Sequence, residues 1–182
     1  MVLNSEEGSP QIGLTEVIGD YQSFVSDTLK SAIYAGIDLR DYPIDHLCFR
    51  TQTVEDYQRT KPLIQNFSKG ILENLHHGRP VTKFLLSQPI IIGEYEIPVI
   101  EMPVPRPGQV IQTGLEHLEM VVGDDYEIIK ERYNGLWSGA DDSGEFNQPM
   151  FITFENGHSI KFHKLPISEV IRLEGNSFQE VK

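Results

Sequence analysis

The sequence predicts an α+β domain built from two similar halves whose sheets curve around a shared cavity. Three observations lead to this prediction. Helical patterns alternate with short strands rich in Val and Ile, and the order of a strand, a helix and further strands occurs twice along the 182 residues. In the first and last strand of each half, polar side chains alternate with apolar ones. Such strands need an interior that holds a metal ion or a polar ligand, which predicts the cavity.

Composition limits the classes of partner. The chain has 27 acidic and 15 basic residues, which gives a net charge of −12. Because phosphate backbones and anionic membrane surfaces are bound by clustered Lys and Arg, this charge argues against nucleic acid and membrane partners. All apolar runs are far shorter than the ~20 residues that cross a bilayer, so no membrane span is predicted.

The cysteine content and the start of the chain bear on its location. Cys48 is the only cysteine, which excludes an intramolecular disulfide. The chain also opens without the charged and apolar segments of a secretory signal. Both features predict a cytoplasmic protein. We expect it to act on a small molecule as a monomer or a homodimer.

The first elements can be placed in chain order. Residues 1–13 are polar, contain Gly and Pro, and predict a flexible leader before a single domain over residues 14–182. Apolar residues recur at three- and four-residue steps over 14–36, which predicts an amphipathic helix. Module one, residues 44–104, begins with a strand. Thr53 and the acidic turn after it predict the N-cap of a second helix, and about three strands follow.

The remainder repeats this order in a shorter form. Residues 105–112 predict a linker between the halves, because the prolines around it cannot join a central ladder. Module two, residues 113–165, has the strand "GLEHLEMVV", an acid-started helix and a hairpin that turns at residues 155–157. Loop 138–147 shows no strand pattern, so we expect this module to lack one strand. A short C-terminal helix over 167–174 is predicted to begin at a Ser168 cap.

The polar side chains of the strands fall on one face. In the first strand of module one, His46, Cys48 and Arg50 point to the same side, because successive side chains alternate. The first strand of module two places His117 and Glu119 together in the same way. The last strand of each half repeats the pattern, and its polar inward residues are Glu101 in the first half and Lys161 with His163 in the second.

These inward faces carry candidate metal ligands. Imidazole and carboxylate groups suit Fe(II), Mn(II), Zn(II), Ni(II) and Co(II). One candidate lies on the first and last strand of each half: His46, Glu101, His117 and His163. We therefore predict a divalent metal site whose ligands are distant in sequence, although no local motif such as HExxH accompanies it. Two histidines and one carboxylate with open positions form a known catalytic arrangement.

Each of these residues also has a structural interpretation. Glu101 could pair with Arg50 or Lys83, since a lone carboxylate among Val, Ile and Met is costly to bury. Glu119 could act as a general base beside the metal, or it could form an ion pair with Lys161. The remaining histidines are expected to be structural hydrogen-bonding groups: His76, His77 and His158.

Two arginines are candidates for substrate binding. Arg50 and Arg79 could hold a carboxylate or phosphate, or they could pair with structural acids. Arg50 lies four residues along the strand from His46, which corresponds to ~13 Å at ~3.3 Å per residue. That distance suits a clamp on the far end of a metal-bound substrate. Cys48, by contrast, is expected to be a small buried apolar group.

A resemblance to a known family is carried by five segments: "IDHLCFR", "GRPVTKF", "IPVIEMPVP", "GLEHLEMVV" and "SIKFHKLPISEVI". They resemble segments of the YecM family, small proteins similar to the vicinal-oxygen-chelate superfamily of glyoxalases, epimerases and extradiol dioxygenases. The resemblance extends from about Leu14 to Ile171. It implies two βαβββ modules whose curved sheets enclose a divalent metal, with ligands on the first and last strand of each module. His46, Glu101 and His117 fall on ligand positions of that pattern.

The fourth ligand position departs from the family pattern. When "NGHSIKF" is aligned by its turn with the usual "NGxxIE" ending, Lys161 stands at the position of the glutamate. His163 lies two residues further along the same face. Because a protonated lysine is a poor ligand, either His163 replaces the missing carboxylate or the metal keeps three protein ligands.

The resemblance also implies a function. It predicts a metal-dependent enzyme of the isomerase, lyase or dioxygenase type, in which the metal chelates adjacent oxygens of a small anionic substrate and stabilises enolate charge. Glu119 and Arg50 are the candidate catalytic side chains. The alternative is a non-catalytic protein that sequesters a small molecule in the same cavity without metal, as antibiotic-resistance members of the superfamily do. Metal analysis of the purified protein distinguishes the two.

Overall fold

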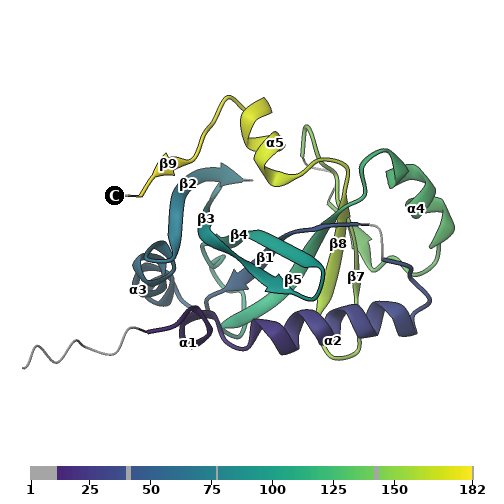
Figure 1. Cartoon of the computed structure of the whole chain (residues 1–182), viewed down its shortest axis with the longest axis horizontal. Coiled ribbons are helices and arrows are strands. Elements are labelled where there is room, and N and C mark those ends of the chain that lie inside the picture. The colour runs from purple at the N-terminus through teal and green to yellow at the C-terminus, as the bar shows by residue number, and fades with distance from the viewer. Residues whose placement is uncertain (1–11, 40–41, 77, 142–143, 182) are drawn as a thin grey trace, which may run out of the picture.

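The computed structural model describes residues 12–39, 42–76, 78–141 and 144–181, so most of the predicted leader lies outside it. Within these residues, nine strands form one sheet in the order β6-β7-β8-β5-β1-β4-β3-β2-β9. Helices pack against this sheet and at its ends (Figure 1). No helix in the described ranges is long and apolar enough to cross a membrane. The predicted α+β class is confirmed.

The elements divide into two modules and three flanking helices. Module one contains β1 (Ile44–Arg50), α3 (Val54–Gln65), β2 (Ser68–His76), β3 (Arg79–Ile92) and β4 (Tyr95–Pro103). Module two contains β5 (Gly114–Val121), the turn η1 (Gly123–Asp125), α4 (Tyr126–Arg132), β6 (Gly139–Ala140), β7 (Met150–Thr153) and β8 (Ser159–His163). The flanking elements are α1 (Leu14–Ile18), α2 (Tyr21–Tyr34), α5 (Ile167–Leu173) and the edge strand β9 (Gln179–Glu180).

The pairing of the strands relates the modules by a pseudo-twofold axis. In each module the first strand pairs in parallel with the last, β1 with β4 and β5 with β8. The two first strands pair antiparallel at the centre of the sheet. Each module therefore has the βαβββ order, and the predicted arrangement of two such modules is confirmed.

Of the first two predicted helices, one differs from the structure and the other is confirmed at its start. The single helix expected over 14–36 is two helices, because Gly19 adopts φ 87° after α1 and Asp20 begins α2 by accepting the Ser23 N–H at 2.9 Å. The predicted Thr53 cap of α3 is confirmed by a 3.0 Å bond from the Asp56 N–H.

The C-terminal part of the prediction also needs correction. Ser168 does not cap α5, whose N-cap is Pro166. The first free N–H of this helix, on Ile167, is instead satisfied by the Asp45 carboxylate of β1 at 2.9 Å. The strand expected to be missing from module two is present as the two-residue β6, which pairs with β7.

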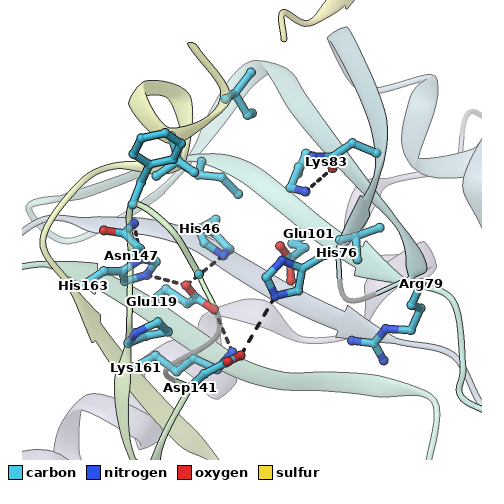
Figure 2. A pocket seen from close by; sticks show the side chains of 18 of the residues that line it. His46, His76, Arg79, Lys83, Glu101, Glu119, Asp141, Asn147, Lys161 and His163 are labelled. Atoms are coloured by element: carbon cyan, nitrogen blue, oxygen red, sulfur yellow. Dashed lines mark hydrogen bonds and ion pairs between the residues drawn. The ribbon is translucent and has the colours of Figure 1, made fainter. Parts of the chain in front are cut away.

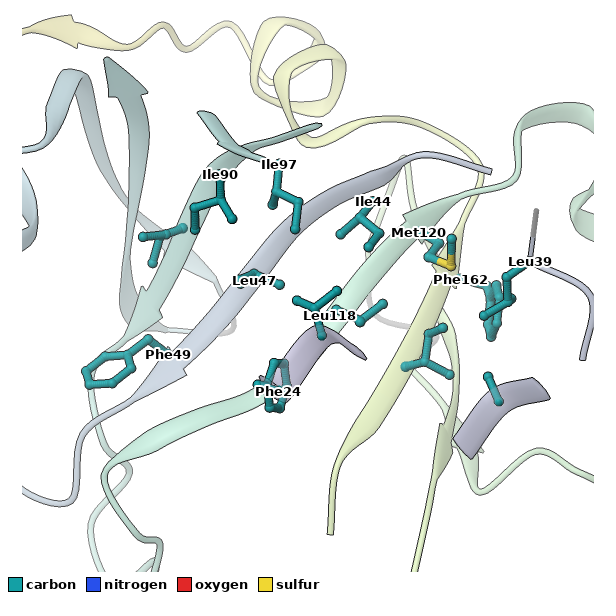
Figure 3. Packing of buried hydrophobic residues seen from close by; sticks show 14 of the residues in the cluster. Phe24, Leu39, Ile44, Leu47, Phe49, Ile90, Ile97, Leu118, Met120 and Phe162 are labelled. Carbon is teal, nitrogen blue, oxygen red and sulfur yellow. The ribbon is translucent and has the colours of Figure 1, made fainter. Parts of the chain in front are cut away.

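The two faces of the central strands have different roles. One face is apolar and packs under α2, whose Phe24 belongs to the same buried cluster as Leu47, Leu118 and Phe162 of neighbouring strands (Figure 3). These side chains are almost fully buried. Because side chains alternate, the polar residues of the same strands point to the opposite face, where the site lies.

Candidate functional site

Four adjacent strands, β8, β5, β1 and β4, bring the polar residues into one row. The register across these strands gives four neighbouring pairs: Cys48 with Glu101, Cys48 with His117, His46 with Glu119, and Glu119 with Lys161. Residues from both modules therefore meet at the centre of the sheet, although they are far apart in sequence. Figure 2 shows His46, Glu119, Lys161 and His163 around one point, with Glu101 beside them.

A pocket of about 470 Å³ lies over this row. Every residue that the sequence predicted as a ligand or catalytic group lines it: His46, Arg50, Glu101, His117, Glu119 and His163. Helix α5 and residues 144–147 contribute to its walls. The volume suits a small molecule, in the size range of ligand pockets.

Each module orients its first histidine with the acid that precedes it. Asp45 Oδ2 lies 2.8 Å from His46 Nδ1, and Glu116 Oε2 lies 3.0 Å from His117 Nδ1. A carboxylate at Nδ1 fixes the ring and places the hydrogen on that nitrogen. The Nε2 atoms of both histidines are thereby directed into the site. The repeated acid–histidine pair was visible in "DH" and "EH" of the sequence, but the sequence analysis did not use it.

Glu119 is the hub of the site. Its Oε2 lies 3.2 Å from His46 Nε2 and also contacts His163 Nε2. Its Oε1 lies 2.9 Å from His117 Nε2 and 3.1 Å from Lys161 Nζ. Of the two roles considered for Glu119, the ion pair with Lys161 is therefore formed, and the carboxylate is only 5% exposed.

The charges around Glu119 shift the pKa values of the site. Burial raises the pKa of Glu119, but the positive charges of His46 and Lys161, together with the hydrogen bond from His117, outweigh it and hold the pKa well below its usual range. Burial lowers the pKa of His46, while Glu119 and Asp45 outweigh this effect and raise it well above the ordinary value. A carboxylate with so low a pKa is a weak proton acceptor near neutral pH, which disfavours Glu119 as a general base.

His117 also binds its proton tightly. Burial lowers its pKa, but the neighbouring Cys48 and Glu116 outweigh that effect and raise it to about 10. With carboxylates at both ring nitrogens, the protonated ring donates to Glu116 and to Glu119.

Two buried imidazole nitrogens have no hydrogen-bond partner. His46 Nε2 and His163 Nε2 both lie close to Glu119 Oε2, but neither is aligned with it for a hydrogen bond. The two rings are perpendicular, with centroids 5.8 Å apart. Buried polar atoms that remain unpaired are costly, so His46 Nε2 and the Glu119 oxygen beside it fit the binding of a cation that displaces the second proton of His46.

Glu101 has a free carboxylate. No described residue forms a hydrogen bond or a close ion pair with it. The structural partners considered for it are engaged elsewhere, because Arg50 Nε lies 2.7 Å from Glu116 and Lys83 Nζ lies 2.6 Å from Asn74 Oδ1. Burial raises the pKa of Glu101, but positive charge, first that of His46, lowers it overall. An ionised carboxylate in this position can ligate a metal.

The described side chains that can share a metal fall into three overlapping groups: Asp45 with His46 and His163, Cys48 with Glu101 and His117, and His46 with Glu101 and Glu119. The four predicted ligands are thus in one pocket but not in one group. The set that includes Glu119 was missed because its neighbour Lys161 made the ion pair the commoner interpretation. Cys48 is fully buried, as predicted, although it borders the site.

Asn147 fixes the orientation of His163. The Asn147 amide is held by two bonds to the Leu165 backbone, accepting the N–H at 2.9 Å and donating to the carbonyl at 2.7 Å. Its Nδ2 also lies 3.1 Å from His163 Nδ1. Because Nδ2 is a donor, His163 Nδ1 accepts, and the ring hydrogen is on Nε2. That nitrogen then has no lone pair for a metal, which favours the alternative without His163 as a ligand.

The other histidines lie at different places. His158 is on the opposite face, where Nδ1 lies 3.2 Å from Thr28 Oγ1 and the ring packs on Phe24, so its predicted structural role is confirmed. His76, which the sequence analysis also took as structural, lines the pocket, 4.0 Å from Asp141 (Figure 2). His77 is outside the described residues.

Comparison with known proteins identifies the family. The sequence profile of the family described as "YecM protein" matches residues 13–174. The chain belongs to the YecM family. The protein YecM of Escherichia coli (strain K12) is 22% identical over 176 residues, which are 88% of this chain and 94% of that protein.

One solved structure supports the fold of this YecM-family chain. A structure titled "Structural Genomics, Protein EC4020" has a TM-score of 0.69 at 22% identity, covering 90% of this chain and 97% of the other. The fosfomycin resistance protein FosX from Mesorhizobium loti matches with a TM-score of 0.25 at 11% identity, covering 71% and 94% of the two chains. The first match shows a shared fold. The second is too weak to support an inference about function.

Proposed function

We propose that this YecM-family protein is a divalent-metal-dependent enzyme that acts on a small substrate with adjacent oxygen atoms. The observation that carries the proposal is the unpartnered Nε2 atom of His46, which lies beside the Glu119 carboxylate in a buried pocket while Asp45 holds the Nδ1 of the same ring. The free Glu101 carboxylate faces the same pocket. This combination is what a site adapted to a cation requires.

We assign the metal to His46, Glu101 and Glu119, whose ligand atoms form one group. Zn, Fe, Mn, Ni and Co all suit such a set of nitrogen and oxygen donors. His117 orients Glu119 through its hydrogen bond, and it can become a fourth ligand after its proton leaves, since metal binding displaces protons from ligands. When bound, the metal supplies Lewis acidity at the chelated oxygens of the substrate.

The residues around the metal group have separate tasks. Lys161 neutralises one oxygen of Glu119, and His163 contacts the other. Arg50, at the end of β1, holds an anionic part of the substrate. The resemblance of the sequence and of the order of its two modules to vicinal-oxygen-chelate proteins supports an isomerase, lyase or dioxygenase type of reaction.

A second function is favoured by one observation. The Lys161 ammonium occupies the place of a metal-binding carboxylate, 3.1 Å from Glu119, and a nearby divalent cation is repelled by it. The alternative is therefore a non-catalytic protein that binds a small molecule in this pocket without metal. Either form fits a cytoplasmic protein, since the sole cysteine, Cys48, is a free and buried thiol. We expect a monomer or a homodimer in both cases.

Metal content tests the proposal. We expect the purified protein to carry about one divalent metal per chain, because no described residue forms a hydrogen bond or close ion pair with the Glu101 carboxylate. Glu101→Gln should lose most of this metal, whereas Glu96→Gln, at an exposed position of the same strand, should retain it. Elemental analysis and metal titration measure both. If wild-type protein from metal-supplemented medium contains no metal and binds none on titration, the non-catalytic alternative replaces the proposal.

A further inference from the structure

Three arginines lie at the same end of neighbouring strands of the sheet. Arg50 ends β1, Arg79 begins β3, and Arg106 follows β4. Because β4 runs parallel to β1 and antiparallel to β3, these three chain positions lie at the same end of the three strands. All three line the pocket, and Figure 2 shows Arg79 apart from Glu119 and His163. This arginine cluster therefore lies at a different part of the pocket from the metal group.

Two guanidinium groups of this arginine cluster have buried N–H atoms without partners. Arg50 donates from Nε to Glu116 at 2.7 Å, but its Nη1 is buried and unpaired. Arg79 Nε is likewise buried and unpaired, and no described residue forms an ion pair with Arg79. A guanidinium that stabilised the fold would be expected to have its buried donors satisfied. These donors are instead left for something that enters the pocket.

The electrostatics of the arginine cluster point the same way. Burial lowers the pKa of Arg79, and the positive charges of Arg50 and Arg106 lower it further. Glu116 is engaged by Arg50 and His117, and Glu101 is assigned to the metal. Arg50, Arg79 and Arg106 all line this pocket, and a negatively charged ligand would relieve the repulsion of Arg79 by the other two.

We propose that Arg50 and Arg79 form an oxyanion subsite that binds a carboxylate or phosphate group of the substrate. Two guanidinium groups with free N–H atoms match the several acceptor oxygens of such an anion. The inference deepens the proposed function and rests on it for the other end of the ligand. The substrate class is then a small molecule with adjacent oxygens for the metal at one end and an oxyanion at the other. Arg106 adds charge at the exposed side of the pocket.

The test uses two simple anions and a matched variant. Inorganic phosphate and acetate are titrated into metal-free protein, prepared with a chelator, and binding is followed by NMR and by the thermal unfolding midpoint. We expect Arg79→Gln to weaken binding of the preferred anion by roughly tenfold or more, since charged hydrogen bonds are lost. Arg59→Gln, an exposed arginine on α3 paired with Asp56, removes the same charge and should bind like wild type. The preferred anion distinguishes a phosphate from a carboxylate substrate.

The outcomes separate the subsite from the metal proposal. Binding to metal-free protein that is lost in Arg79→Gln supports the subsite even if metal analysis fails. Equal binding by wild type and Arg79→Gln, or no binding of either anion by metal-free wild type, overturns it. Circular dichroism checks that the variant folds; if it does not, Arg79→Lys replaces it, because lysine keeps the charge but not the paired donors. In that variant, unchanged affinity contradicts a guanidinium subsite.

Discussion

His46 and His163 place their Nε2 atoms beside the same carboxylate oxygen, yet their Nδ1 partners are of opposite kinds. Asp45 accepts a hydrogen from His46 Nδ1, whereas Asn147 donates one to His163 Nδ1. Once a metal displaces the second proton of His46, the first arrangement leaves a lone pair on Nε2, whereas the second arrangement places the hydrogen there. Two histidines that look equivalent in sequence therefore have different capacities to bind a metal.

The two histidines should respond differently to substitution. We expect His46→Ala to remove metal binding, and His163→Ala to retain metal with an affinity only ~10–100-fold below wild type, the usual effect of losing an outer partner of a ligand. Calorimetric metal titration measures both affinities. His158→Ala, which changes a histidine on the opposite face, is the control. Equal losses in the His46 and His163 variants would make His163 a full ligand.

For single residues, the alternation of side chains along the strands predicted which of them line the pocket. It placed His46, Glu101 and His117 there without any contact information. It did not predict Asn147, because this residue belongs to a loop with no periodic pattern and acts through the backbone of Leu165. Nor did it predict Glu119 as the hub, because strand parity gives the direction of a side chain and not the number of its partners.

The loop before β7 has a structural role that the sequence did not predict, because it connects two other segments of the pocket wall. Asn147 ties this loop to the segment that leads into α5, and it also holds His163. Gly144 lies against this contact, because an added Cβ would stand 2.0 Å from the Asn147 carbonyl oxygen. A side chain at position 144 cannot be accommodated without moving Asn147, since the obstacle is backbone.

Gly144→Ala should therefore loosen this side of the pocket. We expect a loss of about 1–3 kcal/mol in the free energy of unfolding, the usual cost of forced overpacking, and a shift of the His163 ring resonances. Chemical denaturation and NMR measure the two effects. Gly13→Ala is the control, because its added Cβ meets nothing within 4 Å and its φ is −82°. Unchanged His163 resonances would show that the loop moves without Asn147.

Element boundaries were less predictable than element types. The apolar pattern runs through residues 14–34 without interruption, so it did not reveal that Gly19 separates two helices. The start of α5 depends on Asp45, a residue 122 positions earlier in the chain. Because that cap is a tertiary contact, the local sequence favoured Ser168 instead. The strand β6 consists of two residues, too few to show alternation.

The whole molecule has a symmetric frame and an asymmetric site. Asp45–His46 in one module corresponds to Glu116–His117 in the other, and both pairs make the same hydrogen bond. Glu101 pairs with Cys48 in parallel strands, as Lys161 does with Glu119. Lys161 is thus the counterpart of Glu101 across the pseudo-twofold axis. The arrangement of two modules was predictable from the repeated order of elements. The effect of having Lys161 where the other module has Glu101 was not, because it depends on distances that only the folded chain defines.

Lys161→Glu tests how the asymmetry controls the site. The change removes an ammonium that lies 3.1 Å from Glu119 and adds a carboxylate at the same place. We expect divalent metal to bind more tightly by roughly tenfold or more, because a repelling charge near the ion becomes an attracting one. Without metal the variant should be less stable than wild type, since the new carboxylate lies beside the buried Glu119. Metal titration and thermal unfolding with and without chelator measure the two effects.

Lys69→Glu provides the matched control, because it makes the same charge change at an exposed position of β2. It should alter neither metal affinity nor the difference between the two unfolding curves. Weaker metal binding in the Lys161 variant would contradict the assignment of the metal to His46, Glu101 and Glu119, since a further oxygen donor beside that group can only strengthen it. Unchanged binding would place the ion away from Glu119. In either case we would conclude that Lys161, and not a metal ion, balances the charge of Glu119 in the wild-type protein, as the non-catalytic alternative requires.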